Sequence, residues 1–352
     1  MRLTIARQDL ARVLTNVGRV IESRNTIPIL SNVLLSAKDG RLQVTGTDLD
    51  IVATDATAAD VTEEGSICVD AKLLADISKK AGGDISISLE ADRLVVKSGR
   101  SRFALPTLDA KDLPTFAADD YTAGFEADLA ALFAPVAFAI GNDANRPFLH
   151  GVFFHVMDGK AVAVATNGHR LARHTGQELP EFNGVIVPQK AVGMLPKGPA
   201  QVSVNENLIR IVSGDFTLTS KLIDGTFPDY RRVIPTENDL VASAEKDDLL
   251  KASDRVATVS SERGNAVKLS IAPGAIALTV NSVERGEAAD EVQAEYSGKP
   301  VEIGFNSIYF RDALQVFPAG LVNLALRDSG SPALITSPVY PALDVTLMPM
   351  RV

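Results

Sequence analysis

Histidines are the first side chains to consider for acid–base or metal chemistry, because imidazole titrates near neutral pH and binds metal ions. The chain has four of them, at His150, His155, His169 and His174. The apolar residues between the first two predict a strand over Gly151–Phe154, and side chains five positions apart on a strand point to opposite faces. His150 and His155 therefore cannot share a metal ion, and we predict no metal site.

Paired carboxylates and the one cysteine are the other candidates for catalysis. Asp48 and Asp50 could act as an acid pair, but Thr-Asp-Leu-Asp at the end of a strand is more typical of a turn. Cys68 stands between Ile67 and Val69 in an apolar strand, where we expect a buried and inert thiol. A single cysteine also excludes intrachain disulfides and multi-cysteine metal sites.

Loops that cradle phosphates or present a nucleophile are missing from the sequence. No G-x-G-x-x-G follows a predicted strand, and neither G-x-x-x-x-G-K-[ST] nor G-x-S-x-G occurs. Without these motifs we predict a non-catalytic binding scaffold without a cofactor. The alternative is an enzyme with an unrecognised carboxylate site at Asp48 or Asp50.

Composition limits the class of protein further. The 352 residues include 35 Lys and Arg against 44 Asp and Glu, which gives a net charge of −9, and 46 % are hydrophobic. This length and apolar content predict two or three globular domains. No apolar signal-peptide core follows Met1, no segment has the roughly 18 apolar residues of a membrane span, and one cysteine fits a reducing compartment, so we expect a cytoplasmic protein. The negative charge argues against tight binding of nucleic acid, which depends on phosphate neutralisation.

Strand–helix units recur along the chain at intervals of about one third of its length. After a strand at Leu3–Ala6, apolar residues at helical spacing predict an amphipathic helix, and similar units lie within Gly124–Ile140 and Leu240–Val259. A second strand-then-helix segment also recurs three times, at Ile67–Ala81, Val185–Leu195 and Val301–Phe317.

Short, turn-bounded strands fill the rest of each repeat. The pattern predicts an α+β fold of three similar domains, 1–118, 119–237 and 238–352, each with two helices packed on antiparallel sheets. The alternative is three unrelated domains of similar size.

Basic residues gather on the predicted helices although the whole chain is negative. Residues 236–352 hold 10 basic and 16 acidic residues, so negative charge is concentrated in the last third. The first helix and its exit carry four arginines, Arg7, Arg12, Arg19 and Arg24. Such helices either turn a basic face toward a shared polyanion or carry ordinary solvated charges.

Six segments, taken in order, carry a resemblance to a known family. They are Thr26–Asn32, Gly46–Leu49, Ser98–Phe103, Thr166–Ala172, Phe227–Val233 and Met348–Val352. Together they resemble the bacterial DNA polymerase III beta subunit, the replicative sliding clamp, from residue 1 to residue 352. The resemblance implies a DNA clamp fold in which a head-to-tail homodimer of six similar domains closes a ring around duplex DNA, without enzymatic activity.

A clamp of this kind is a processivity factor, which tethers the replicative polymerase to its template after a clamp-loader ATPase has placed it. Because a ring holds DNA by topology, weak and non-specific phosphate contacts are sufficient. By similarity, the predicted DNA contacts are Arg24, Lys79 and Lys190.

The resemblance also implies a surface pocket that receives linear peptides from polymerases, the clamp loader and repair proteins. Its predicted residues are Leu149, Thr166, Gly168, His169, Arg170, Leu171, Pro228, Arg232, Val233, Met348, Pro349, Met350 and Arg351. The apolar members would form a cleft in which flexible methionines re-pack for several partners, and the arginines would hold polar groups of the peptide. Phe148 and Thr346 stand where the family leads us to expect a tyrosine and a more apolar residue.

The same resemblance places the dimer contact between the first domain of one subunit and the third domain of the other. The predicted residues are Lys97, Arg100, Arg102, Phe103, Thr258, Val259, Glu284, Glu287, Asp290 and Glu291. Basic side chains of the first domain would face acidic ones of the third, with Phe103 near Thr258 and Val259. The main alternative function is a repeat-built assembly protein that oligomerises without DNA.

Overall fold

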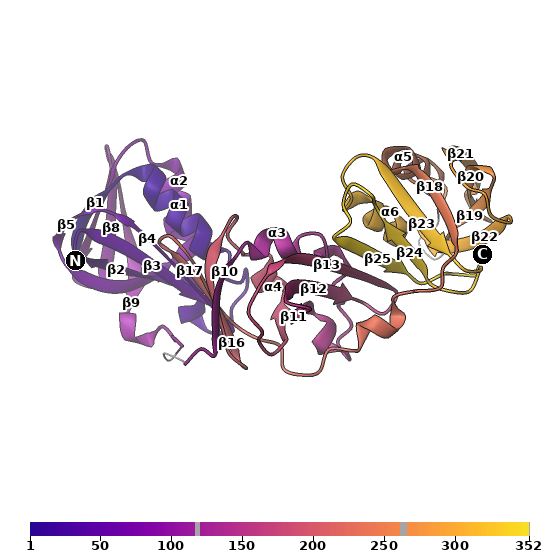
Figure 1. Cartoon of the computed structure of the whole chain (residues 1–352). Coiled ribbons are helices and arrows are strands. Elements are labelled where there is room, and N and C mark those ends of the chain that lie inside the picture. The colour runs from indigo at the N-terminus through magenta and orange to yellow at the C-terminus, as the bar shows by residue number, and fades with distance from the viewer. Residues whose placement is uncertain (117–119, 261–265, 352) are drawn as a thin grey trace. The chain divides into compact units, whose positions relative to one another are not determined.

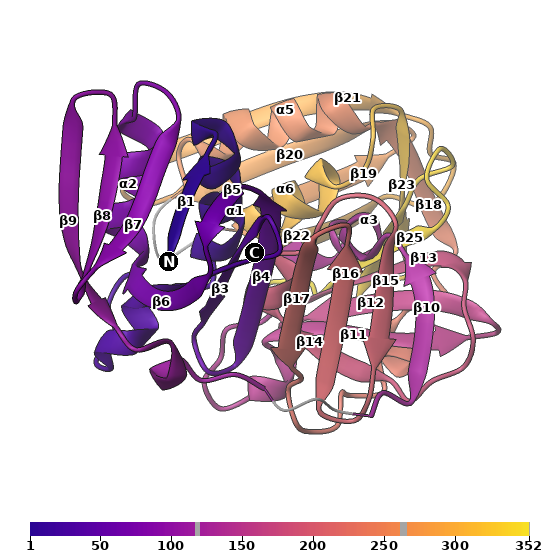
Figure 2. The same ribbon diagram turned by 90° about the vertical axis from the view of Figure 1, so that its left-hand side faces the viewer.

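The chain folds into two compact units, which Figures 1 and 2 show from two sides. A computed structural model describes residues 1–116, 120–260 and 266–351. Unit 1 consists of residues 1–129 and 193–222, and unit 2 consists of residues 130–192 and 223–352. Within the described residues, no helix is long and apolar enough to cross a membrane.

Unit 1 is built on one antiparallel sheet of thirteen strands, in the order β10-β15-β16-β17-β4-β3-β2-β6-β9-β8-β7-β1-β5. Its strands are β1 (Arg2–Ile5), β2 (Asn32–Lys38), β3 (Arg41–Thr47), β4 (Ile51–Ala58), β5 (Asp60–Glu63), β6 (Gly65–Asp70), β7 (Ile85–Glu90), β8 (Arg93–Ser98), β9 (Ser101–Leu108), β10 (Ala123–Ala127), β15 (Ala200–Val204), β16 (Leu208–Ser213) and β17 (Phe216–Lys221). Side chains alternate between buried and less buried along β4, as expected for a sheet with one face on a core.

Two helices, α1 (Arg7–Gly18) and α2 (Ala71–Lys80), pack against each other and cover one face of this sheet (Figure 1). The predicted apolar side of α1 is buried, and it forms one core with residues of α2 and of strands β2, β3, β7 and β8. Asp70 begins α2 by accepting a hydrogen bond from the backbone N–H of Leu73 at 2.7 Å. Gly46 lets α1 approach β3 closely, because a Cβ atom there would lie 2.9 Å from a methyl carbon of Val17. Short 3-10 helices follow at Pro28–Ser31 and Ala110–Asp112.

Unit 2 contains an eight-stranded antiparallel sheet, β14-β11-β12-β13-β25-β24-β23-β18, and a four-stranded one, β21-β20-β19-β22. The strands are β11 (Gly151–Met157), β12 (Lys160–Thr166), β13 (Arg170–Glu178), β14 (Val185–Pro188), β18 (Leu240–Glu245), β19 (Ala266–Ala272), β20 (Gly274–Ser282), β21 (Gly286–Ala294), β22 (Val301–Asn306), β23 (Leu321–Leu326), β24 (Ala333–Thr336) and β25 (Leu343–Leu347). The longer helices, α5 (Lys246–Ala257) and α6 (Ser307–Gln315), pack against each other, and α5 lies along β20 and β21 (Figure 2). Asn306 caps α6 by accepting from the N–H groups of Ile308 and Tyr309.

The middle repeat has much shorter helices than its sequence pattern predicts. The prediction of one helix that extends to Ile140 is wrong. Helix α3 (Leu129–Phe133) has five residues, and a 3-10 helix follows at Ala137–Ala139. Pro135 explains the break, because proline lacks an N–H donor and clashes with the preceding turn of a helix. The helix expected within Val185–Leu195 is the four-residue α4 (Gln189–Val192). Further 3-10 helices lie at Pro147–Leu149 and Tyr230–Val233.

The sheets continue across the expected limits of the middle repeat. In unit 1, β17 of the middle repeat pairs with β4 of the first repeat. In unit 2, β13 of the middle repeat pairs with β25 of the third, from Arg170 opposite Leu347 to His174 opposite Leu343. The predicted α+β fold with antiparallel sheets is confirmed, and the middle repeat contributes strands to both units.

Candidate functional site

A pocket of about 330 Å³ lies in unit 2, where the end of β12, the start of β13, the 3-10 helix at Tyr230–Val233 and the end of β25 come together. Its lining residues are Arg146, Phe148, Leu149, Thr166, Gly168, Arg170, Leu171, Pro228, Asp229, Tyr230, Val233, Thr346 and Met348. We call it the β13 pocket. Eight of the predicted peptide-pocket residues line it, from segments far apart in the sequence.

The floor of the β13 pocket belongs to the hydrophobic core. Leu149, Leu171 and Tyr230 are each at most 5 % exposed and share a core cluster with neighbouring apolar residues. At the rim, Val233 and Met348 are 49 % and 42 % exposed. A buried apolar floor with exposed apolar edges suits the apolar side chains of a ligand.

The turn between β12 and β13 is fixed by its own hydrogen bonds. Oδ1 of Asn167 accepts from the N–H groups of His169 and Arg170 at 2.9 and 3.0 Å, and the Thr166 hydroxyl donates to the carbonyl of Arg170 at 2.8 Å. Gly168 has a φ of +89°, and a Cβ atom there would lie 2.7 Å from Nη1 of Arg146. The positive φ favours glycine at this position, whereas the contact with the flexible end of Arg146 could be relieved by a movement of that side chain.

The wall formed by this turn is also joined to the C-terminal segment. The N–H of Met348 donates to the carbonyl of His169 at 2.9 Å. The His169 ring stacks on Tyr309 of α6 with centroids 6.3 Å apart. His169 thus lies beside the pocket and not in its lining.

Arg146 is a lining residue that the sequence interpretation missed. Its Nε donates to Asp143 at 2.9 Å and its Nη2 to the carbonyl of Asn167 at 3.3 Å, while 40 % of the side chain stays exposed. Hydrogen bonds from the N–H of Asn145 and from Arg146 lower the pKa of Asp143. Arg146 therefore places a guanidinium group, paired with Asp143, in the lining of the pocket. Its place directly before Pro147–Leu149 is the signal that could have identified it.

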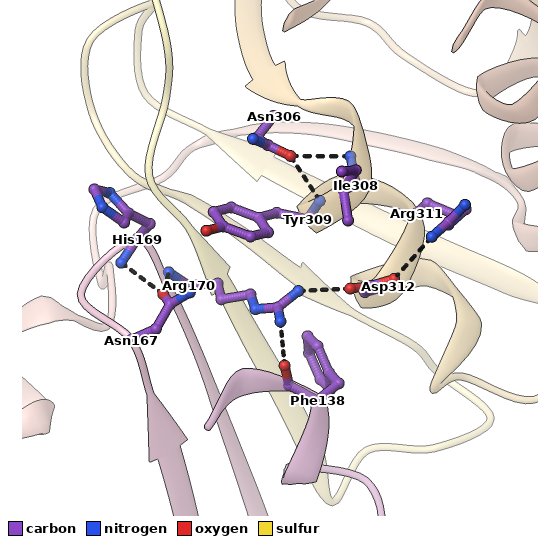
Figure 3. Close-up of polar contacts among 9 residues, drawn as sticks. All are labelled: Phe138, Asn167, His169, Arg170, Asn306, Ile308, Tyr309, Arg311 and Asp312. Carbon is purple, nitrogen blue, oxygen red and sulfur yellow. Dashed lines mark hydrogen bonds and ion pairs between the residues drawn. The ribbon is translucent and has the colours of Figure 1, made fainter. Parts of the chain in front are cut away.

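Arg170 is engaged within the chain (Figure 3). Its Nη1 donates to Oδ2 of Asp312 at 2.7 Å, and its Nη2 donates to the carbonyl of Phe138. Its Cζ lies 5.1 Å from the ring centre of Phe138 and 4.5 Å from that of Tyr309, and the side chain is 11 % exposed. The more exposed arginines at this face are Arg146 and Arg232, of which the latter is 84 % exposed and pairs with Asp229 at 3.1 Å.

Four other predicted pocket residues line neighbouring hollows and not the β13 pocket. Arg232 lines an adjoining hollow of about 320 Å³, which shares Val233 and Met348 with the β13 pocket. The last three, Pro349, Met350 and Arg351, line a polar hollow of about 820 Å³ beside β22. These three residues lie away from the β13 pocket because the chain turns toward β22 after β25. The N–H of Met350 donates there to the carbonyl of Gly304 at 2.7 Å.

Tyr230, Asp229, Phe148 and Thr346 complete the lining. The hydroxyl of Tyr230 lies 3.0 Å from Nε2 of His155, and burial raises the pKa of Tyr230 and lowers that of His155. Thr346 is 3 % exposed, and its hydroxyl has no hydrogen-bond partner among the described residues. The segment Phe227–Val233 contains Asp229 and Tyr230, so the motif located them without assigning them a role.

The predicted DNA contacts lie in both units. Arg24 and Lys79 are exposed in unit 1, with Lys79 in the last turn of α2, and Lys190 is half-buried on α4 of unit 2. Two other arginines, one on the first helix and one directly after it, make contacts within unit 1. Arg12 pairs with the buried Asp55 at 3.0 Å, and Arg19 donates to the carbonyl of Gly193.

The predicted dimer residues lie on a hairpin of unit 1 and around β21 of unit 2. Lys97, Arg100, Arg102 and Phe103 are exposed on β8, β9 and their connection, and Arg102 pairs with Glu90 at 3.2 Å. Glu287, Asp290 and Glu291 lie on β21, where Asp290 pairs with Arg255 at 2.5 Å. Glu284 precedes β21, and Thr258 and Val259 follow α5 directly.

The candidate catalytic residues behave as structural ones. Oδ1 of Asp48 accepts from the N–H groups of Asp50 and Ile51, which is the predicted turn. Cys68 is buried on β6, and burial, with the nearby Asp112 and Asp109, raises the pKa of its thiol to about 11. Among the described residues, no three His, Cys, Asp or Glu side chains are grouped so that they could hold a metal ion.

Comparison with known proteins decides the family. Residues 1–117, 126–229 and 231–351 match the N-terminal, central and C-terminal domains of the DNA polymerase III beta subunit. The chain belongs to this family.

Its relatives are similar over their whole length. It is 41 % identical to the beta sliding clamp of Caulobacter vibrioides and 37 % identical to that of Escherichia coli, with 100 % of both chains covered in each case. A crystal structure of the DNA polymerase III beta subunit sliding clamp from Bartonella birtlesii matches with a TM-score of 0.97 at 38 % identity, again over 100 % of both chains. The prediction of a DNA sliding clamp that acts as a processivity factor and not as an enzyme is confirmed by this relationship.

Proposed function

We propose that this sliding clamp works in the cytoplasm as a ring-shaped, head-to-tail homodimer that encircles duplex DNA and tethers the replicative polymerase. The observation that carries the proposal is the match to beta sliding clamps over the full length of the chain. Each subunit would contribute three clamp domains, 1–118, 119–237 and 238–352.

The charges of the two surfaces and the outer position of β21 in its sheet support the proposed dimer contact. β21 is an outer strand of its sheet and carries Glu287 and Glu291, while the β8–β9 hairpin carries Lys97 and Arg100. An outer strand has backbone groups available for a strand of another chain. Basic residues of the first domain would meet acidic residues of the partner's third domain, and Phe103, which is 40 % exposed, would supply the apolar centre with Thr258 and Val259.

The DNA contacts are proposed to be few and mobile. Arg24, Lys79 and Lys190 would touch phosphates without reading bases, so that the ring slides. With a net charge of −9, the chain is not suited to a tight electrostatic grip, and a closed ring does not need one.

The β13 pocket is the proposed docking site for linear peptides of the polymerase, the clamp loader and repair proteins. Its buried Leu149 and Leu171 would receive apolar side chains of the peptide. Met348 at the rim can re-pack around different partners, because its side chain is flexible and unbranched.

Retention on DNA tests the proposal directly. The protein is loaded by its clamp loader onto nicked circular DNA, and the bound fraction is separated by gel filtration before and after the DNA is linearised. We expect retention on circles and release after linearisation, together with a solution mass twice the 37.4 kDa of one chain. A monomeric mass, or equal retention on both DNA forms, would contradict the ring. An assembly protein that oligomerises without DNA would show no retention on the circles.

A further inference from the structure

One ion pair links the wall of the β13 pocket to helix α6. Arg170 begins β13 in the middle family domain, whereas Asp312 lies on α6 in the C-terminal family domain. Their side chains meet at 2.7 Å and are only 11 % and 23 % exposed. Figure 3 shows the guanidinium held between the rings of Phe138 and Tyr309, with Asp312 at its end.

The position of the Arg170 side chain is determined from several directions. Asp312 and the carbonyl of Phe138 accept from its two Nη atoms, and the two aromatic rings cover its faces. Its Nε is buried without a hydrogen-bond partner in the described part of the chain. A guanidinium in this setting depends on its carboxylate, because a buried charge that loses its partner is strongly unfavourable.

The backbone of Arg170 is part of the turn that shapes the pocket. Its N–H donates to Oδ1 of Asn167, and its carbonyl accepts from the Thr166 hydroxyl. The N–H of Met348 donates to the carbonyl of the neighbouring His169. A shift of Arg170 would therefore disturb Thr166 and Met348, which both line the pocket.

We propose that Asp312 is a positioning residue of the β13 pocket, which acts through Arg170 to hold the turn Thr166–Arg170 and Met348 in the geometry that accepts a peptide. Asp312 is absent from the pocket lining, so its effect on binding is indirect. This inference rests on the proposed peptide-docking function. The ion pair would tie the pocket to α6 of the next domain.

A matched control lies three residues further along β13. Arg173 pairs with Asp344 of β25, and the two side chains are 26 % and 20 % exposed. This pair also joins the middle and C-terminal family domains with similar burial, and neither residue lines the β13 pocket. Asp344→Asn thus measures the general cost of losing an ion pair at the domain junction.

The test measures the affinity of the full-length protein for a fluorescently labelled peptide from the replicative polymerase subunit, by fluorescence anisotropy. We expect Asp312→Asn to weaken binding about tenfold, because the amide can still accept a hydrogen bond but removes the negative charge that compensates the buried guanidinium. Asp344→Asn should change the affinity by less than about twofold, with the same loss of thermal stability. Equal affinities for the two variants would overturn the inference.

A double-mutant cycle separates positioning from a general structural effect. If Asp312 acts through Arg170, Asp312→Asn should have no further effect on peptide affinity in an Arg170→Met background. Additive losses would overturn the inference. Asp312→Glu, which keeps the charge, should recover part of the affinity and serves if the asparagine variant fails to fold. If the unsubstituted protein does not bind the peptide, the proposed docking function is rejected. If it binds and Asp312→Asn binds equally well, only the positioning role of Asp312 is rejected.

Discussion

At the residue scale, Thr346 places a hydroxyl group in an apolar pocket. The side chain is 3 % exposed, and Oγ1 lacks a hydrogen-bond partner within the described residues. An unpaired buried hydroxyl costs about 1–3 kcal/mol. We therefore predict that Thr346→Val raises the free energy of unfolding by about 1 kcal/mol, measured by urea denaturation. Thr346→Ser, which keeps the hydroxyl and loses the methyl group, should instead be destabilised, and a less stable valine variant would contradict the argument.

His174 is the residue whose titration should be visible in stability. It is 8 % exposed, its Nδ1 donates to the carbonyl of Leu132, and its Nε2 accepts from the Tyr340 hydroxyl, each at 2.9 Å. Burial lowers the pKa of His174 below its ordinary 6.5. The unfolded chain therefore binds the proton first, so the contribution to stability is complete above pH 6.5 and decreases as pH falls below it, until the folded-state pKa is passed.

The measurement is urea denaturation of the protein and of His174→Asn between pH 7.5 and 5. We expect the variant to be less stable at pH 7.5, because it loses packing, but to lose less stability on acidification. The carboxylates titrate in both proteins, so the difference between the two slopes isolates His174. Parallel slopes would contradict the prediction.

At the element scale, α1 and α3 show what a helical pattern can and cannot predict. Both segments have apolar residues at helical spacing, and in α1 these positions are buried as predicted. The same spacing continues past Phe133, but Pro135 ends the helix and the remaining apolar residues pack from a 3-10 turn. The apolar spacing predicts which side chains face the core. It does not predict that they lie on one continuous helix when a proline interrupts the segment.

The candidate site, like the helices, was predictable from the sequence only in part. The family resemblance indicated the segments that line the pocket, and in the structure the turn Thr166–Arg170 and Met348 lie directly after the strands that position them. The engagement of Arg170 with Asp312 was not predictable, since it joins residues 142 positions apart. Pro349–Arg351 line a separate hollow beside β22, because the chain turns away after β25.

Helix α1 is fixed to β4 by a buried carboxylate. Asp55 is 1 % exposed and accepts from Arg12 at 3.0 Å, from Asn16 at 2.7 Å and from the N–H of Ala56 at 2.8 Å. We predict that Arg12→Met destabilises the protein by about 2–3 kcal/mol, because it leaves a buried charge without its cation. The check is chemical denaturation, with Arg7→Met as the control on the same helix. If adding Asp55→Asn to Arg12→Met recovers no stability, the buried charge is not the cause.

At the scale of the whole molecule, the net charge of −9 is compatible with a DNA clamp because its distribution matters more than its sum. The excess of acidic over basic residues lies mostly in the last third of the chain, where β21 carries Glu287 and Glu291. Arg102 and Asp290 already have partners within the chain, at Glu90 and Arg255. The proposed dimer contact should therefore depend most on Lys97 and Arg100 of one subunit and on Glu287 and Glu291 of the other.

Charge reversal tests this contact. We predict that Lys97→Glu with Arg100→Glu shifts the solution mass toward the 37.4 kDa monomer, because like charges then face each other at both contacts of the ring. Lys38→Glu with Lys160→Glu changes the net charge equally at exposed positions of other strands and should leave the mass unchanged. The quadruple variant that adds Glu287→Lys and Glu291→Lys restores opposite charges at both contacts of a head-to-tail pair. Sedimentation equilibrium at 50 mM salt, where screening is weak, should therefore show the dimer again. If the quadruple variant remains monomeric while the control is dimeric, these four residues do not face one another.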